Sequence, residues 1–187
     1  MVLPDSKRIY QFTDSYTNIY VNGKLIAEGN RDPITRIKTL PIDLKGKTVL
    51  DLGCNCGGML YAVHNKIKHG IGFDINSEAI ANANQIKTDY SIDNVEFHVK
   101  DLEHHTDFEI PSTDVTFMLS ISRWVTTWKE VLKRVDSDVL IFEAHSKAKS
   151  NEAQEQIDFV KTVYPNVEHL LTAKEIKNVR SLYYCTR

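Results

Sequence analysis

Short apolar segments rich in β-branched residues alternate with longer segments of helical character after residue 46. The predicted strands are residues 48–52, 70–73, 95–99, 115–119, 139–142, 167–171 and 182–185. The predicted helices are residues 58–68, 77–89, 127–134 and 151–163. This alternation indicates an α/β fold with a mostly parallel sheet and helices on both faces. Only TAKEIKNVR separates the last two strands, which is too short for a helical crossover, so we expect that pair to be antiparallel.

The first 44 residues have a different pattern. Asn22 and Gly23 lie between two apolar stretches, which is a strong signal for a β-hairpin. Asp32 followed by Pro33 is typical of a helix N-terminus with Asp32 as the N-cap. We therefore expect residues 1–44 to form a hairpin and helix extension that acts as a substrate lid. Residues 45–187 would form the rest of one compact domain.

The chain has 187 residues, of which 42% are hydrophobic and 26% charged, the balance of an ordinary soluble globular protein. Its net charge of −2 gives no general basic field that would attract nucleic acid or a membrane. No membrane-spanning apolar run or signal region is present, so we expect a cytoplasmic protein. The three cysteines form a poor disulfide framework, and the Cys and His residues lack metal-ligand spacing. The sequence leaves the oligomeric state open.

The first strand after residue 46 runs into a glycine-rich turn, VLDLGCNCGG. Gly53 permits a tight turn, and Gly57 and Gly58 let the following helix start close to the sheet. In a sheet of this kind, ligands bind at the carboxyl ends of the strands, near the point where strand order reverses. The turn is therefore a candidate ligand-binding loop.

This turn differs from the Gly-x-Gly-x-x-Gly fingerprint of dinucleotide-binding proteins. The second glycine of that fingerprint lets the backbone touch a pyrophosphate, and here Asn55 takes its place. Asp51, two residues before Gly53, would repel a phosphate. These residues favour a ligand with positive charge and no phosphate. S-adenosylmethionine (SAM) fits, because it has an ammonium, a sulfonium and an adenosine.

Two further carboxylates follow the next strands. GFDIN ends the second strand with Asp74, about 20 residues after the glycine turn, where an acidic residue accepts hydrogen bonds from both ribose hydroxyls. VKDLE ends the third strand with Asp101, where a carboxylate can accept from an adenine amino group. An Asp at either place also suits a helix cap or a strand-end turn.

These three motifs together, VLDLGCNCGG, GFDIN and VKDLE, resemble those of class I SAM-dependent methyltransferases. The resemblance covers residues 45–187 and implies a Rossmann-like sheet of seven strands with the last one inserted antiparallel. It implies cofactor contacts from Asp51, Gly53, Cys54, Asn55 and Gly57, from Asp74 and Ile75, from Asp101 and Leu102, and from Leu119. Within this set Asp74 would hold the ribose, Ile75 would lie against the adenine, and Leu119 would lie near the sulfonium.

The fourth strand and its end, DVTFMLSISRW, are where this family usually sets its acceptor chemistry. The stretch lacks the Asn/Asp-Pro-Pro-aromatic signature of amino-methylating enzymes, the Pro-Cys of cytosine C5 enzymes and the carboxylates of metal-dependent catechol-type enzymes. We therefore predict a small-molecule acceptor, with oxygen favoured over nitrogen, and no metal. The predicted catalytic residues are His145 as base, Glu143 and Ser122; the predicted substrate contacts are Ser120, Arg123, Trp124 and Tyr16.

Other interpretations stay open. LSISRWV is weakly similar to a stretch of RNA 5′-end methyltransferases of the bicoid-interacting family, which makes RNA an alternative acceptor. A non-methyl SAM-using enzyme and a non-catalytic SAM-binding subunit are further alternatives. The six histidines other than His145 are predicted to lie on the surface. Lys174, Lys177 and Arg180 in the last connection are predicted to form a solvated loop.

Overall fold

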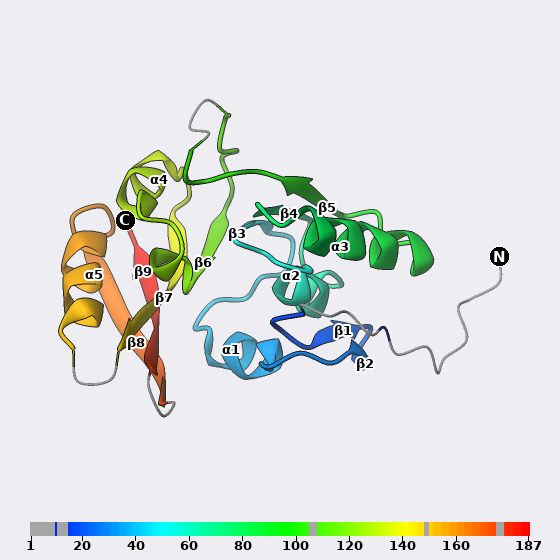
Figure 1. Cartoon of the computed structure of the whole chain (residues 1–187), viewed down its shortest axis with the longest axis horizontal. Helices are drawn as coiled ribbons and strands as arrows, with labels where there is room; N and C mark the ends of the chain where they lie inside the picture. The colour runs from blue at the N-terminus through cyan, green and yellow to red at the C-terminus, as the bar shows by residue number, and fades with distance from the viewer. Residues whose placement is uncertain (1–9, 11–14, 105–107, 148–149, 175–177) are drawn as a thin grey trace. The chain divides into compact units, whose positions relative to one another are not determined.

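The computed structural model describes residues 10, 15–104, 108–147, 150–174 and 178–187. Its main sheet has seven strands in the order β5-β4-β3-β6-β7-β9-β8 (Figure 1). The strands are β3 (Thr48–Leu52), β4 (His69–Asp74), β5 (Val95–Val99), β6 (Val115–Leu119), β7 (Val139–Lys147), β8 (Asn166–Lys174) and β9 (Asn178–Thr186). The pairs β3–β4, β4–β5 and β6–β7 are parallel, whereas β9 is antiparallel to both β7 and β8. This confirms the predicted mostly parallel sheet with its last strand inserted antiparallel.

The chain divides into two compact units. The first contains residues 1–38 and 43–100, and the second contains residues 39–42 and 101–187. Each unit buries large side chains of its own, such as Tyr61 and Leu50 in the first and Phe117 and Tyr164 in the second. No helix in the described part of the chain is long and apolar enough to span a membrane.

The first unit begins with a hairpin of β1 (Ile19–Val21) and β2 (Lys24–Ala27). Asn22 and Gly23 have φ angles of 51° and 77°, the left-handed conformation that a tight hairpin turn requires, as predicted. Helix α1 (Pro33–Thr39) begins at Pro33. Asp32 accepts a hydrogen bond from the backbone N–H of Ile34 at 3.0 Å, which confirms it as the cap.

Helix α2 (Gly58–Val63) is shorter than predicted. The carbonyl oxygens of His64 and Ile67 accept hydrogen bonds from the Asn94 side chain at 2.7 and 3.1 Å, so backbone acceptors that follow the helix are satisfied without another turn. The His64 ring bonds the carbonyl of Tyr61 at 2.6 Å and is only 9% exposed. The prediction of a surface position was therefore wrong for His64. Helix α3 (Ser77–Asp89) follows β4 and packs against β4 and β5.

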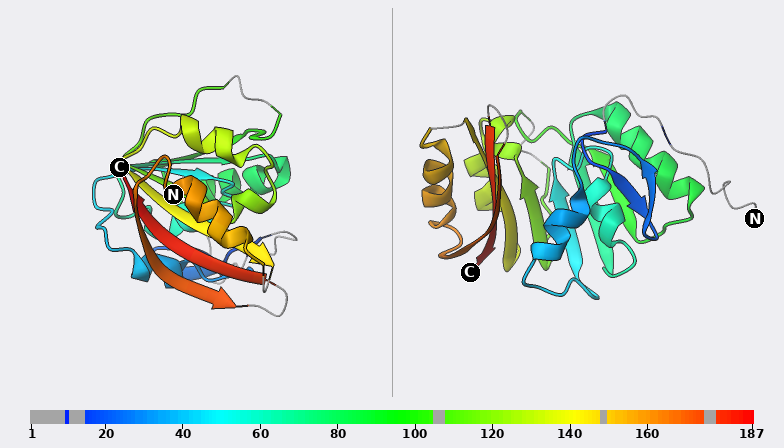
Figure 2. Two further views of the ribbon diagram at one scale, coloured as in Figure 1. Left: turned by 90° about the vertical axis from the view of Figure 1, so that its left-hand side faces the viewer. Right: turned by 90° about the horizontal axis from the view of Figure 1, so that it is seen from below.

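The second unit contains η1 (Ile121–Arg123), α4 (Trp128–Arg134) and α5 (Glu152–Val160) besides β6 to β9. Helix α5 packs against β7 (Figure 2). The ring of Trp128 lies 5.7 Å from that of Phe142 and 5.4 Å from that of Phe159, so this tryptophan packs between helix and sheet.

Strand β7 extends five residues beyond its predicted end because the antiparallel strand β9 continues beside it, with Arg180 opposite His145. Arg180 is consequently 4% exposed inside β9. Its predicted place in a solvated loop was wrong, and Lys177 lies outside the described residues.

Candidate active site

The turn after β3 has an unusual backbone. Gly53, Asn55 and Gly57 have φ angles of 77°, 49° and 78°, so three of five residues are left-handed. The N–H groups of Gly53 and Cys54 both donate to the carbonyl of Phe73, at 2.8 and 3.0 Å, which fixes the turn to the end of β4. The side chain of Cys54 is buried at 6% exposure, and its carbonyl accepts from the N–H of Gly57 at 2.9 Å.

Gly57 meets a steric limit as well as a conformational one. A Cβ atom at this position would lie 2.5 Å from Cε1 of Phe97, closer than real Cβ contacts. The glycine therefore lets α2 begin close to the sheet, as the sequence predicted.

Two carboxylates belong to this turn. Asp51 is 3% exposed, and burial, followed by the charge of Asp74, raises its pKa from 3.8 to about 7, while Arg36 acts in the opposite direction. The carboxylate of Asp74 accepts from the N–H groups of Asn55 and Asn76, each at 2.8 Å. The local field of the two carboxylates opposes a phosphate and favours a cation, which is the charge that SAM carries.

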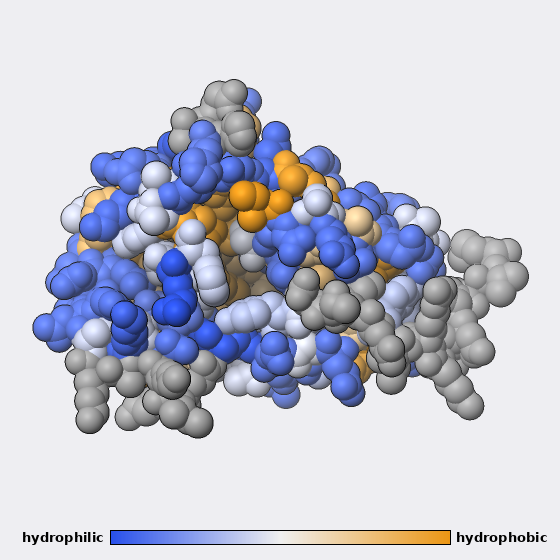
Figure 3. Space-filling model, in the orientation of Figure 1, coloured by the Kyte–Doolittle hydropathy of each residue, from blue (hydrophilic) through white to orange (hydrophobic). Residues whose placement is uncertain are grey.

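Exposed apolar side chains lie beside Asp74. Among the described residues the exposed large hydrophobic side chains are Leu25, Ile75, Val99 and Trp124, and most of the face in Figure 3 is hydrophilic. Ile75 is 61% exposed and Val99 is 50% exposed, and Val99 is opposite Asp74 in the β4–β5 register. Together they offer apolar surface suited to a flat ring. Sequence reasoning missed Val99, although it continues the alternate positions Val95 and Phe97, whose side chains are buried.

Tyr16, predicted as a substrate contact, lies at the glycine turn. Its backbone N–H donates to Oδ1 of Asn55 at 3.1 Å, and the Arg31 guanidinium lies 4.8 Å from the centre of its ring. Tyr10, within the predicted lid, is 8% exposed and its hydroxyl donates to Asp89. Residues 1–9 and 11–14 of that segment lie outside the described residues.

The other predicted cofactor residues belong to the second unit. Asp101 organises a turn: its Oδ1 accepts from the N–H groups of Glu103 and His104 at 2.8 and 3.1 Å. Leu102 is buried at 5% exposure, and Leu119 is half-buried at the end of β6.

Ser120 and Glu143 are joined by two hydrogen bonds inside the second unit. The backbone N–H of Ser120 donates to the carbonyl of Glu143 at 3.0 Å, and the Ser120 hydroxyl donates to the Glu143 carboxylate at 2.5 Å. Their exposures are 4% and 2%. Trp124 is different, because it is 71% exposed, with the Arg123 guanidinium 5.6 Å from its ring centre.

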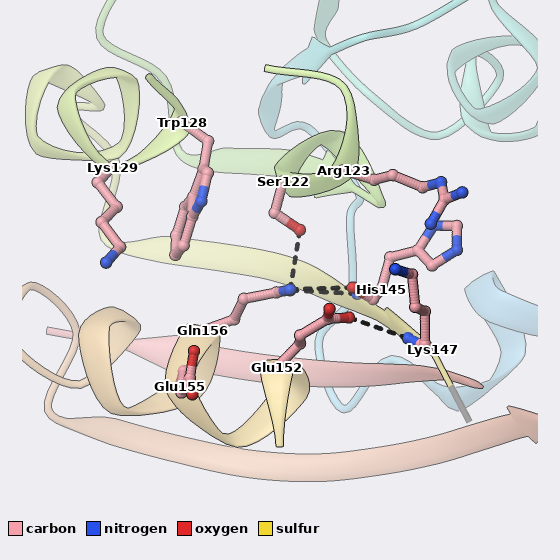
Figure 4. A pocket seen from close by; sticks show the side chains of 9 residues that line it. All are labelled: Ser122, Arg123, Trp128, Lys129, His145, Lys147, Glu152, Glu155 and Gln156. Carbon is pink, nitrogen blue, oxygen red and sulfur yellow. Dashed lines mark hydrogen bonds between the residues drawn. The ribbon is translucent and has the colours of Figure 1, made fainter. Parts of the chain in front are cut away.

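A pocket of about 350 Å³ in the second unit brings together several predicted residues (Figure 4). It is lined by Ser122, Arg123, Trp128, Lys129, His145, Lys147, Glu152, Glu155 and Gln156. Ser122, Arg123 and His145 were predicted, whereas Gln156 and its α5 neighbours were missed. Positions 152, 155 and 156 share a helix face by their spacing, which is a signal that the sequence did contain.

The family described as "Methyltransferase domain" matches residues 43–175. No curated protein matches the chain. The N-terminal domain of EvdMO1, solved in the presence of SAH and D-fucose, is 15% identical with a TM-score of 0.71, covering 90% of this chain and 89% of that one. The bifunctional kinase-methyltransferase WbdD is 16% identical with a TM-score of 0.72, covering 94% of this chain and 44% of that one. A precorrin-6y C5,15-methyltransferase from Geobacter metallireducens is 12% identical with a TM-score of 0.62, covering 83% and 88%.

Proposed function

We propose, given that this chain belongs to the methyltransferase domain family and uses SAM as its cofactor, that it methylates a hydroxyl group of a small polar molecule. The observation that carries the proposal is the pocket of the second unit, where Ser122 and His145 line a space of about 350 Å³. That volume lies at the low end of the range for small-molecule sites. The lining is rich in hydroxyl, amide and charged groups, which orient a polar ligand by hydrogen bonds.

The cofactor is assigned to the residues that the sequence singled out. SAM supplies a methyl group on a positively charged sulfur, which leaves readily. The turn from Gly53 to Gly57 and Asp51 would hold its methionine part, and Asp74 its ribose. In the first unit the adenine contacts would come from Ile75 and Val99; in the second unit the resemblance assigns Asp101, Leu102 and Leu119 to the cofactor. The turn is suited to this cation, because a positive ligand would stabilise the charged form of the Asp51 carboxyl, which burial disfavours.

Oxygen is the favoured acceptor atom for two reasons. The amino-methylating signature is missing after β6, where the chain reads LSISRW. An alcohol is also a poor nucleophile until it loses its proton, and histidine, here His145, is the side chain that most often accepts one as a general base. Ser122 would orient the acceptor molecule, and the buried Ser120–Glu143 pair would hold together the two segments that carry Ser122 and His145.

RNA is the second candidate acceptor, because Trp124 is 71% exposed beside Arg123. Exposed aromatic rings with neighbouring arginines stack on unpaired bases. An RNA acceptor would therefore depend on Trp124, whereas a small acceptor in the pocket would not.

Methyl-labelled SAM tests the proposal directly. D-fucose, the small polyhydroxyl present with the EvdMO1 domain, is the first probe, followed by other monosaccharides and a short 5′-triphosphate RNA. We expect label in a sugar hydroxyl with wild type and with Trp124→Ala, and none with Asp74→Ala. Label in the RNA, lost in Trp124→Ala, would replace the small-molecule proposal with the RNA one, and label on an amine would refute the preference for oxygen.

A further inference from the structure

Strand β7 extends past the end of β6. The last residue of β6, Leu119, is opposite Glu143, and the N–H of Ser120 still reaches the Glu143 carbonyl at 3.0 Å. Further along that edge, the backbone of His145 needs a donor and an acceptor from elsewhere, because buried backbone groups are nearly always paired.

The side chain of Gln156 supplies both. Its Oε1 accepts from the N–H of His145 at 3.1 Å, and its Nε2 donates to the carbonyl of His145 at 2.9 Å. The amide on α5 thus replaces a neighbouring strand at this one residue. Figure 4 shows these bonds, together with a third one from Ser122 to the same amide.

The third bond fixes the direction of the Ser122 hydroxyl. A backbone N–H only donates and a carbonyl only accepts, so the pairing with His145 sets which end of the Gln156 amide is oxygen. Ser122 Oγ lies 2.8 Å from that oxygen. Since an amide oxygen cannot donate, the single proton of Ser122 goes to Gln156, and the lone pairs of Ser122 remain for the pocket.

We propose that Gln156 is a positioning residue that makes Ser122 a hydrogen-bond acceptor and holds His145 in place. This inference rests on the proposed function for its consequence: the pocket selects molecules that bring a donor to Ser122, such as a second hydroxyl beside the one that His145 deprotonates. Gln156 therefore contributes to the selection of the acceptor.

Amide hydrogen exchange tests the hydrogen bonds between Gln156 and the backbone of His145, and it needs no methyl acceptor. Gln156→Leu has no acceptor for the N–H of His145, and we expect that amide to exchange at least about tenfold faster, the effect of one lost hydrogen bond. Gln156→Glu keeps an accepting oxygen and should keep most of the protection. The amide of Leu140 in the same strand is the control for general destabilisation. Equal exchange of His145 in wild type and Gln156→Leu would overturn the inference.

Kinetics with D-fucose tests the consequence. Ser122→Ala and Gln156→Leu should each raise KM about tenfold, and the double variant should have a KM no higher than Ser122→Ala alone, because Gln156 acts on acceptor binding through Ser122. SAM affinity should stay at the wild-type value. Additive effects would show that Gln156 does not act through Ser122. If wild type methylates no hydroxyl probe but the exchange result is as expected, the proposed acceptor class is wrong, and the positioning role of Gln156 is retained.

Discussion

The backbone N–H of Tyr16 donates to Oδ1 of Asn55, at 3.1 Å and across 39 residues of sequence. Asn55 occupies the left-handed position, at φ 49°, where the dinucleotide fingerprint has its second glycine. Asparagine tolerates this conformation better than most residues and adds a side-chain acceptor that glycine lacks. The segment before β1 is therefore tied to the turn that we assign to the cofactor.

Asn55→Gly should separate the side-chain role of Asn55 from its backbone role. Glycine adopts the same φ without strain, so the variant removes only the acceptor for Tyr16. We expect the Tyr16 amide to exchange about tenfold faster, as for one lost hydrogen bond, and SAM to bind more weakly. Asn22→Gly, at another left-handed Asn with φ 51°, is the matched control and should change neither. Unchanged Tyr16 exchange in Asn55→Gly would contradict the link.

Asp74→Ala should weaken SAM binding by about 2–4 kcal/mol, the value of two charge-assisted hydrogen bonds to ribose. This corresponds to about 30- to 1,000-fold in Kd by calorimetry. Glu78→Ala removes an exposed carboxylate in the first turn of α3 and should leave Kd unchanged. The assignment of Asp74 fails if Asp74→Ala binds SAM within a factor of two of wild type.

Asp51 should make stability depend on pH. Its pKa in the folded protein is about 7, above the ordinary 3.8, so between these values the folded protein holds a proton that the unfolded chain has released. The stability contribution of Asp51 is thus greatest at low pH and falls as pH rises towards 7, by up to about 1.4 kcal/mol per unit.

Asp51→Asn, which resembles the protonated form, isolates this effect. Denaturant unfolding at several pH values should show wild type losing stability relative to the variant from about pH 4 to 7, and a constant difference above that. Parallel curves for the two proteins would show that Asp51 does not titrate in this window.

Gly57→Ala should destabilise the fold through two effects. Its φ of 78° costs an L-residue about 1–2 kcal/mol, and the new Cβ would lie 2.5 Å from Phe97, which adds about 1–3 kcal/mol of overpacking. Gly46→Ala has a φ of 72° and no atom within 4 Å, so it measures the backbone cost alone. Equal losses of unfolding free energy in the two variants would mean that Phe97 moves aside freely.

His145→Ala should reduce kcat while leaving SAM affinity nearly unchanged, if His145 is the base. His169→Ala removes an exposed histidine of the same unit and should turn over normally. Normal turnover by His145→Ala would remove it from the catalytic residues.

The fold was predictable where its causes are local. Residues 48–52, 95–99 and 115–119 were predicted as strands with the bounds that the structure has. Residues 48–52 and 115–119 are nearly continuous apolar runs, which mark buried parallel strands. The glycine turn was predictable because few residues adopt a positive φ. His64 and Arg180 were mispredicted as exposed, since polarity alone does not reveal a partner such as the Tyr61 carbonyl or a neighbouring strand.

The sequence alone was enough to predict the strand–helix alternation, the glycine-rich turn after β3, and the carboxylates Asp51 and Asp74 near their strand ends. Folding decided the rest: that Asp51 is buried deeply enough to titrate near neutrality, that Asn55 binds Tyr16, and that Gln156 binds Ser122 across 34 residues. Secondary structure leaves a periodic pattern in the sequence, because each turn or strand repeats the same geometry. A single hydrogen bond between residues far apart in sequence leaves no periodic pattern, so only the tertiary structure reveals it.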